Sequence, residues 1–157
     1  MSRLRDTITV ICTGNTCRSP MAERLIAHAL QAEPSALSSL RVCSAGIAGI
    51  QNAAPSENSV LALKKVGIPL EDHRGQMLTQ SIIDRSYLIM GMTQSHLSAL
   101  DLYFDNTCPH TYLIRDFVEN SHDPEIPDPV GMPLEAYEAC RDAMADAVPG
   151  ILKFLRK

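Results

Sequence analysis

Residues 7–20 are TITVICTGNTCRSP, and this stretch decides the fold. Its first half, residues 7–12, is apolar and β-branched, as a buried strand would be. A turn-like loop follows, and Ser19 with Pro20 then supplies an N-cap and a first-turn proline for a helix that reaches about Leu30. A strand that leads through a short loop into a helix is typical of α/β proteins.

The rest of the chain alternates between strand and helix patterns. Further strands are predicted at residues 41–46, 87–92 and 111–114, and further helices at 56–66, 93–102 and from Leu134 onward, where Pro149 can introduce a kink. Ser56 and Thr93 are candidate N-caps, and Gly67 is a candidate C-terminal glycine. Residues 119–133 are polar and proline-rich, which predicts a surface loop. We therefore expect one α/β domain over residues 1–157, with a four-stranded parallel sheet flanked by helices on both faces in three layers.

Composition narrows the classes of function. The 157 residues are 45% hydrophobic and 20% charged, with a net charge of -4, which is usual for a globular domain. No basic block is present to bind nucleic acid, and the apolar run at residues 8–12 is too short for a signal peptide or a membrane span. Five cysteines without a CxxC pair indicate neither a disulfide framework nor a zinc site, so we expect a cytoplasmic protein without metal or cofactor. The oligomeric state is left open.

The loop after the first strand has the features of an anion site. In a parallel sheet, ligands bind at the carboxyl ends of the strands, where this loop meets the strand ends at Ser44 and Met92. Backbone N–H groups and the helix dipole attract an oxyanion there, and Gly14 allows a close approach. Arg18 can chelate two phosphate oxygens with its planar guanidinium group. The predicted phosphate-binding residues are Thr13, Gly14, Asn15, Thr16, Cys17 and Arg18.

A thiol beside a phosphate site suggests nucleophilic catalysis. The positive surroundings favour the thiolate of Cys12, Ser19 can donate a hydrogen bond to its sulfur, and Asn15 can pin the loop. Asp128, held between two prolines, can protonate the leaving group and later activate water. Each residue also has a non-catalytic interpretation. Cys12 can be a buried structural thiol, Arg18 a partner in a surface ion pair, and Asp128 an ordinary turn aspartate. Cys17 either packs under the loop or forms a protective disulfide with Cys12 on oxidation.

Residues 8–23, ITVICTGNTCRSPMAE, resemble the signature of the low-molecular-weight protein tyrosine phosphatases: Cys, five residues, Arg, then Ser or Thr. The resemblance extends over nearly the whole chain, through Ser44-Ala45-Gly46, Gly67-Ile68 with His73, Met92-Thr93 and Asp128-Pro129. It implies a four-stranded parallel sheet, with Cys12 as nucleophile, Arg18 as phosphate ligand and Asp128 as general acid. Asn15, Ser19, Ser44 and His73 would support them. His73, His96 and His110 have no ligand spacing, and all three are predicted to be structural or solvated.

Two departures from the family pattern concern the substrate. Thr16 stands where many members have a bulky aliphatic residue, and the bacterial protein-arginine phosphatases resemble this chain in having threonine there. Residues 128–131, DPVG, lack the paired aromatic residues that line the phosphotyrosine cleft of eukaryotic members. Phosphotyrosine in a protein substrate is the family default, and phosphoarginine is nearly as well supported.

The sequence argues against two other functions. An arsenate reductase needs a closely spaced pair of downstream cysteines, and residues 71–92 contain no cysteine. A catalytically silent phosphoprotein-binding module would need neither Cys12 nor Asp128, and both are present.

Overall fold

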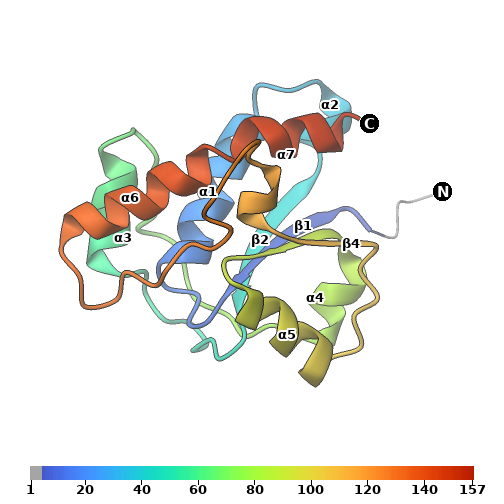
Figure 1. Cartoon of the computed structure of the whole chain (residues 1–157), viewed down its shortest axis with the longest axis horizontal. Coiled ribbons are helices and arrows are strands. Elements are labelled where there is room, and N and C mark those ends of the chain that lie inside the picture. The colour runs from blue at the N-terminus through green and yellow to red at the C-terminus, as the bar shows by residue number, and fades with distance from the viewer. Residues whose placement is uncertain (1–4) are drawn as a thin grey trace.

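A computed structural model describes residues 5–157 (Figure 1). Its centre is a four-stranded parallel sheet with the strand order β2-β1-β3-β4. The strands are β1 (Thr7–Cys12), β2 (Arg41–Gly46), β3 (Ser86–Gly91) and β4 (His110–Leu113). Helices cover both faces of this sheet, which confirms the predicted fold class. Residues 1–4, which the predicted single domain includes, lie outside the described residues.

Strand β1 is an internal strand that pairs with β2 on one side and with β3 on the other, and every one of its residues is buried. Its side chains alternate between two cores, with Ile8 in the larger core and Ile11 in the smaller one. Cys12 at its end lies beside Gly46 of β2, and Ile11 lies beside Gly91 of β3. Because the strands are parallel, their carboxyl ends meet at one edge of the sheet, and this edge is where such folds bind ligands.

Helices of unequal number cover the two faces (Figure 1). The larger core lies under α1 (Arg18–Leu30), α3 (Glu57–Lys64), α6 (Leu134–Ala145) and α7 (Val148–Leu155). The smaller core lies under α4 (Gln80–Arg85) and α5 (Gln94–Tyr103). Two short elements, α2 (Ser35–Ser38) and the 3-10 helix η1 (Ile114–Phe117), complete the chain. No helix within residues 5–157 is long and apolar enough to cross a membrane.

Several local signals predicted helix ends correctly. Ser56 caps α3, with its hydroxyl accepting from the backbone N–H of Ser59, and Gly67 follows this helix with a positive φ of 79°. Thr93 is the N-cap of α5. The N-cap prediction at Ser19 is wrong, because α1 begins at Arg18 with Cys17 at the N-cap position. Ser19 therefore lies inside the helix, where its hydroxyl is free to contact the preceding loop.

The predicted C-terminal helix is in fact two helices. The chain turns at Asp146 and Ala147 before α7, so Pro149 is the second residue of a new helix, where its missing N–H needs no partner. Helix α7 packs so closely on η1 that a Cβ atom at Gly150 would collide with the carbonyl oxygen of Phe117. This packing fixes the start of the loop between η1 and α6, residues 118–133, which we call the acid loop.

Candidate active site

Residues 13–17, which we call the anion loop, turn from the end of β1 into the first residue of α1. Asn15 has a positive φ of 57°, which bends the chain around a concave surface. Within residues 5–157, the backbone N–H groups of Gly14, Asn15, Thr16 and Cys17 donate to no other group. A curved row of free N–H groups at a helix N-terminus is suited to bind an oxyanion.

The thiol of Cys12 lies under this loop and is only 1% exposed. Its sulfur is 2.9 Å from Oγ of Ser19, and that oxygen also accepts a 2.9 Å hydrogen bond from Nδ2 of Asn15. Because the Ser19 oxygen is already an acceptor for Asn15, its single proton is available to the sulfur. The Ser19 hydroxyl is therefore placed to donate a hydrogen bond to the sulfur of Cys12.

Asn15 is the hub that holds the anion loop. Its Nδ2 also donates to Oγ of Ser44 at 2.9 Å, and its Oδ1 accepts from the backbone N–H of Gln76 at 2.9 Å. Its carbonyl oxygen lies 3.0 Å from Nε2 of His73. Ser44 in turn donates to Oε1 of Glu23 at 2.7 Å. The predicted supporting residues thus meet at one place, and Gln76 and Glu23 join them without any local sequence signal.

Arg18 is the first residue of α1 and is 3% exposed. Its Nη1 donates to the carbonyl oxygen of Ile126 at 2.9 Å, and its Nη2 lies 3.8 Å from Oδ2 of Asp128. Its Nε is buried and has no hydrogen-bond partner among residues 5–157. Buried donors nearly always have a partner, so this N–H is suited to an oxyanion held by the loop.

Asp128 comes from the acid loop, and its side chain is 48% exposed. Its Oδ1 accepts from the backbone N–H of Val130 at 3.0 Å, which fixes the carboxylate in a turn. The same oxygen is 3.9 Å from the sulfur of Cys17. The tertiary structure thus brings an exposed carboxylate from late in the chain to the rim of the anion loop.

Cys17 is a second thiol at this site and is 5% exposed. Burial, together with the nearby Cys12 and Asp128, raises the pKa of Cys17 to about 12. The side chain is therefore a neutral thiol at physiological pH. All five cysteines are free in the structure.

His96 was predicted to be structural or solvated, and the structure shows it buried beside the site. Its Nε2 is 3.1 Å from Oγ1 of Thr13. Burial and the neighbouring Arg18 lower the pKa of His96 to about 4, so the ring is neutral near pH 7. Only the helix start at Thr93 hinted at this position, because a residue three places after an N-cap often returns a hydrogen bond.

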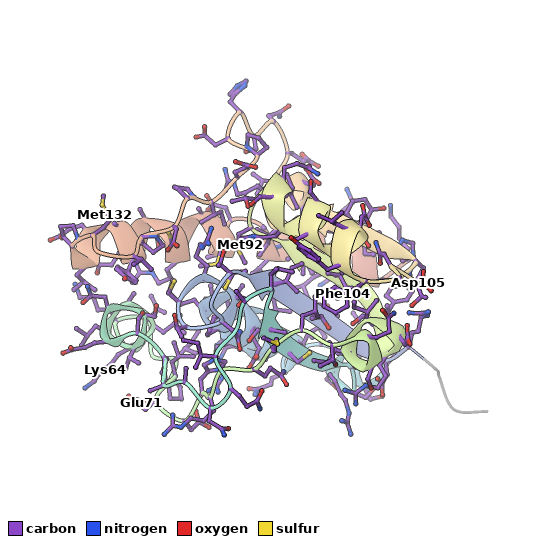
Figure 2. The ribbon with its side chains drawn as sticks, turned by 90° about the horizontal axis from the view of Figure 1, so that it is seen from below. Lys64, Glu71, Met92, Phe104, Asp105 and Met132 are labelled. Carbon is purple, nitrogen blue, oxygen red and sulfur yellow. The ribbon has the colours of Figure 1, made fainter. Side chains whose placement is uncertain are left out.

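The mouth of the site has apolar but no aromatic residues in the acid loop. Val130 is 64% exposed and Met132, labelled beside the start of α6 in Figure 2, is 53% exposed. A cavity of about 460 Å³ separates the acid loop from α6, and Asp128 lines one of its walls. Within residues 5–157, no three His, Cys, Asp or Glu side chains gather as metal ligands.

Comparisons with known proteins show the family to which the chain belongs. The profile of the family described as low molecular weight phosphotyrosine protein phosphatase matches residues 7–157. The chain is 32% identical over 149 residues to a protein-arginine-phosphatase of Geobacillus stearothermophilus, covering 95% of each chain. It is 30% identical over 139 residues to the low molecular weight protein-tyrosine-phosphatase Etp of Escherichia coli K12, covering 88% of this chain and 87% of Etp.

A solved structure gives the same result. The tyrosine phosphatase Wzb from Escherichia coli K30, in complex with sulphate, superposes with a TM-score of 0.84 at 30% identity, covering 96% of this chain and 99% of Wzb. The relatives share protein phosphatase activity and differ in the phosphorylated residue that their names give. The chain therefore belongs to the low-molecular-weight phosphotyrosine protein phosphatase family and is a protein phosphatase.

Proposed function

We propose that the protein removes a phosphoryl group from a phosphorylated side chain of a protein substrate through a phosphocysteine intermediate. The observation that carries this proposal is the hydrogen-bonded series Asn15, Ser19 and Cys12, which aims a hydroxyl proton at a buried sulfur beneath free loop N–H groups. A merely structural thiol would have no need of that donor. We further propose that residues 1–157 act as one domain in the cytoplasm, the compartment that five free cysteines favour.

The first step forms the phosphocysteine. The loop N–H groups and Nε of Arg18 hold the phosphoryl oxygens, so the sulfur of Cys12 lies below the phosphorus atom. A bond forms from sulfur to phosphorus as the bond from phosphorus to the leaving group breaks. Asp128 donates its proton to the departing oxygen or nitrogen atom, so that tyrosine leaves as a neutral phenol and arginine leaves as its guanidinium cation.

The second step restores the enzyme. The Asp128 carboxylate now accepts a proton from water, and the water oxygen attacks phosphorus. The bond from sulfur to phosphorus breaks, inorganic phosphate leaves, and Cys12 departs as a thiolate that the Ser19 hydroxyl stabilises. Asp128 is protonated again and ready for the next substrate.

Phosphotyrosine is the first candidate substrate, because the family description and relatives such as Etp name this residue. Phosphoarginine is the second candidate, and two observations favour it. Thr16 places its Oγ1 above Gly14, where an added Cβ atom would lie 3.7 Å from that oxygen, so the loop offers a polar group instead of an aliphatic one. Val130, beside Asp128, gives the mouth no aromatic wall on which a phenyl ring could stack.

The experiment that tests the activity uses the Cys12→Ser variant of the full chain with p-nitrophenyl phosphate. We expect turnover to fall to the background rate, while isothermal titration still detects binding of inorganic phosphate. A variant that retains turnover would remove Cys12 as the nucleophile. A wild-type protein that binds phosphate but hydrolyses no phosphomonoester would instead be a binding module.

A further inference from the structure

The turn formed by residues 92–96 leads from the end of β3 into the first residues of α5, and it lies between the two loops that supply the site. Met92 is buried in the core that also contains residues of α1 and α6, and Figure 2 labels it at the end of the strand. The side chain of His96 contacts the anion loop, while backbone groups of the same turn contact the acid loop. This turn is therefore the structural connection between the nucleophile and the general acid.

The hydrogen bonds of His96 fix which ring nitrogen carries the proton. Its Nδ1 lies 3.3 Å from the backbone N–H of Met92 and 3.2 Å from that of Thr93, so it must be an acceptor without a hydrogen. The proton is then on Nε2, which donates to Oγ1 of Thr13 at 3.1 Å. His96 is 4% exposed, so water does not compete for these bonds.

The acid loop is attached to the other side of this turn. The backbone N–H of Ile126 donates to the carbonyl oxygen of Met92 at 3.0 Å, and Oε2 of Glu125 accepts from the backbone N–H of Gln94 at 2.6 Å. Ile126 also accepts the 2.9 Å hydrogen bond from Arg18. The position of Asp128, two residues later, thus depends on where this turn is held.

We propose that His96 is a positioning residue that sets the placement of the Asp128 loop relative to Cys12 through its hydrogen bond to Thr13. The inference rests on the proposed phosphatase mechanism, in which Asp128 must reach the leaving group while Cys12 attacks. Without the bond from Nε2 to Thr13, the turn and the acid loop lose their attachment to the residue that follows the nucleophile. Transfer of the proton from Asp128 would then become less efficient, because small misplacements of a reacting group cost much of its rate.

A helix cap alone does not explain an imidazole here. Capping uses only Nδ1, and a shorter amide side chain supplies an oxygen acceptor at that position. The His96→Asn variant therefore keeps an acceptor for the N–H groups of Met92 and Thr93, but it cannot also reach Thr13. Thr13→Val removes the partner hydroxyl from an exposed residue, and Thr13→Ser retains it.

The test compares kcat/KM for phenyl phosphate, a poor leaving group, with kcat/KM for p-nitrophenyl phosphate, a good one. We expect His96→Asn and Thr13→Val each to lower the phenyl phosphate value about tenfold more than the p-nitrophenyl phosphate value. The double variant should lose no more than either single one, because both changes remove the same bond. Thr13→Ser keeps the hydroxyl and should therefore keep the wild-type ratio of the two kcat/KM values. His110→Asn is the matched control, because His110 packs among Tyr87 and Phe154 instead.

The outcomes separate two questions. Suppose that the wild-type protein hydrolyses both esters and that His96→Asn leaves the ratio of the two kcat/KM values unchanged. The proposed positioning role of His96 is then wrong, even if the variant has a lower melting temperature. Losses that multiply in the double variant would also overturn it, since the two residues would then act separately. If the wild-type protein hydrolyses neither ester, the proposed function itself fails.

Discussion

The hydroxyl of Ser19 lies 2.9 Å from the sulfur of Cys12, and Asn15 determines the direction of this hydrogen bond. Since Nδ2 of Asn15 donates to the Ser19 oxygen, the serine proton is left for the sulfur. A serine in the first turn of α1 thus contacts the residue that ends β1, and the geometry of the anion loop makes this contact possible.

Removing that donor should impair the breakdown of the phosphocysteine more than its formation. We expect Ser19→Ala to lower kcat for p-nitrophenyl phosphate by about 10- to 100-fold, because the departing thiolate loses a charge-assisted hydrogen bond of about 1.5–3 kcal/mol. Stopped-flow measurement should show a burst of p-nitrophenol followed by slow turnover. Ser98→Ala, at an exposed position in α5, is the control and should behave as wild type. An equal rate for Ser19→Ala would show that this donor is dispensable.

The role of Asp128 is tested by its dependence on the leaving group. Asp128→Asn keeps the size of the side chain but cannot supply the proton, so kcat/KM for phenyl phosphate should fall by about 10²- to 10⁴-fold. The loss should be much smaller for p-nitrophenyl phosphate, whose phenolate leaves readily. Asp123→Asn, an exposed acid in the same loop, should change neither value. A uniform loss for both esters would mean that Asp128 only supports the loop.

The identity of residue 16 should influence the choice of substrate. We expect Thr16→Ile to raise the ratio of kcat/KM for a phosphotyrosyl peptide to that for a phosphoarginyl peptide by about tenfold, because an aliphatic contact worth about 1–3 kcal/mol replaces a hydroxyl. Thr107→Ile, at an exposed position distant from the anion loop, is the control. An unchanged ratio would mean that Thr16 does not influence the choice between phosphotyrosine and phosphoarginine.

Oxidation should be reversible only while Cys17 is present. Hydrogen peroxide converts the Cys12 thiolate to a sulfenic acid, and the Cys17 thiol then displaces water to form a disulfide. Cys17 is not the first to react, because burial and the nearby charges raise its pKa to about 12. We expect dithiothreitol to restore activity to peroxide-treated wild type and to Cys108→Ser. It should not restore activity to Cys17→Ser, because excess peroxide oxidises the unprotected sulfenic acid further to a sulfinic acid, which dithiothreitol does not reduce. Equal recovery in all three proteins would rule out the disulfide.

The neutral ring of His96 makes stability depend on pH. Its pKa is lowered from 6.5 to about 4 by burial and by Arg18, against the opposing charges of Asp128 and Glu125. As the pH falls below 6.5, His96 binds a proton in the unfolded chain, but in the folded chain it does so only near pH 4. The folded state therefore loses stability as the pH falls through this window. Between pH 7.5 and 4.5 this contribution amounts to about 2–3 kcal/mol. Urea unfolding of His96→Asn should show a correspondingly flatter pH dependence, and an unchanged slope would contradict the assignment.

Local patterns predicted the elements on which the site is built. The β-branched run before Cys12 became the buried central strand, and Ser56, Gly67 and Thr93 marked helix ends as expected. Local patterns were less informative where contacts between residues far apart in the sequence decide where a helix begins or ends. The division between α6 and α7 depends on the approach of Gly150 to Phe117, which no local signal reveals.

The sequence alone determined the anion loop, because Cys12, the backbone N–H donors and Arg18 are consecutive residues whose spacing is set by the passage from strand to helix. Only the tertiary structure decided what surrounds that loop. Asp128 and His96 lie in distant segments, and their positions follow from the parallel strand order, which places the ends of β1 and β3 side by side. Local signals describe hydrogen bonds within a few residues, whereas the bond between His96 and Thr13 joins residues 83 positions apart. It forms only after the sheet has assembled.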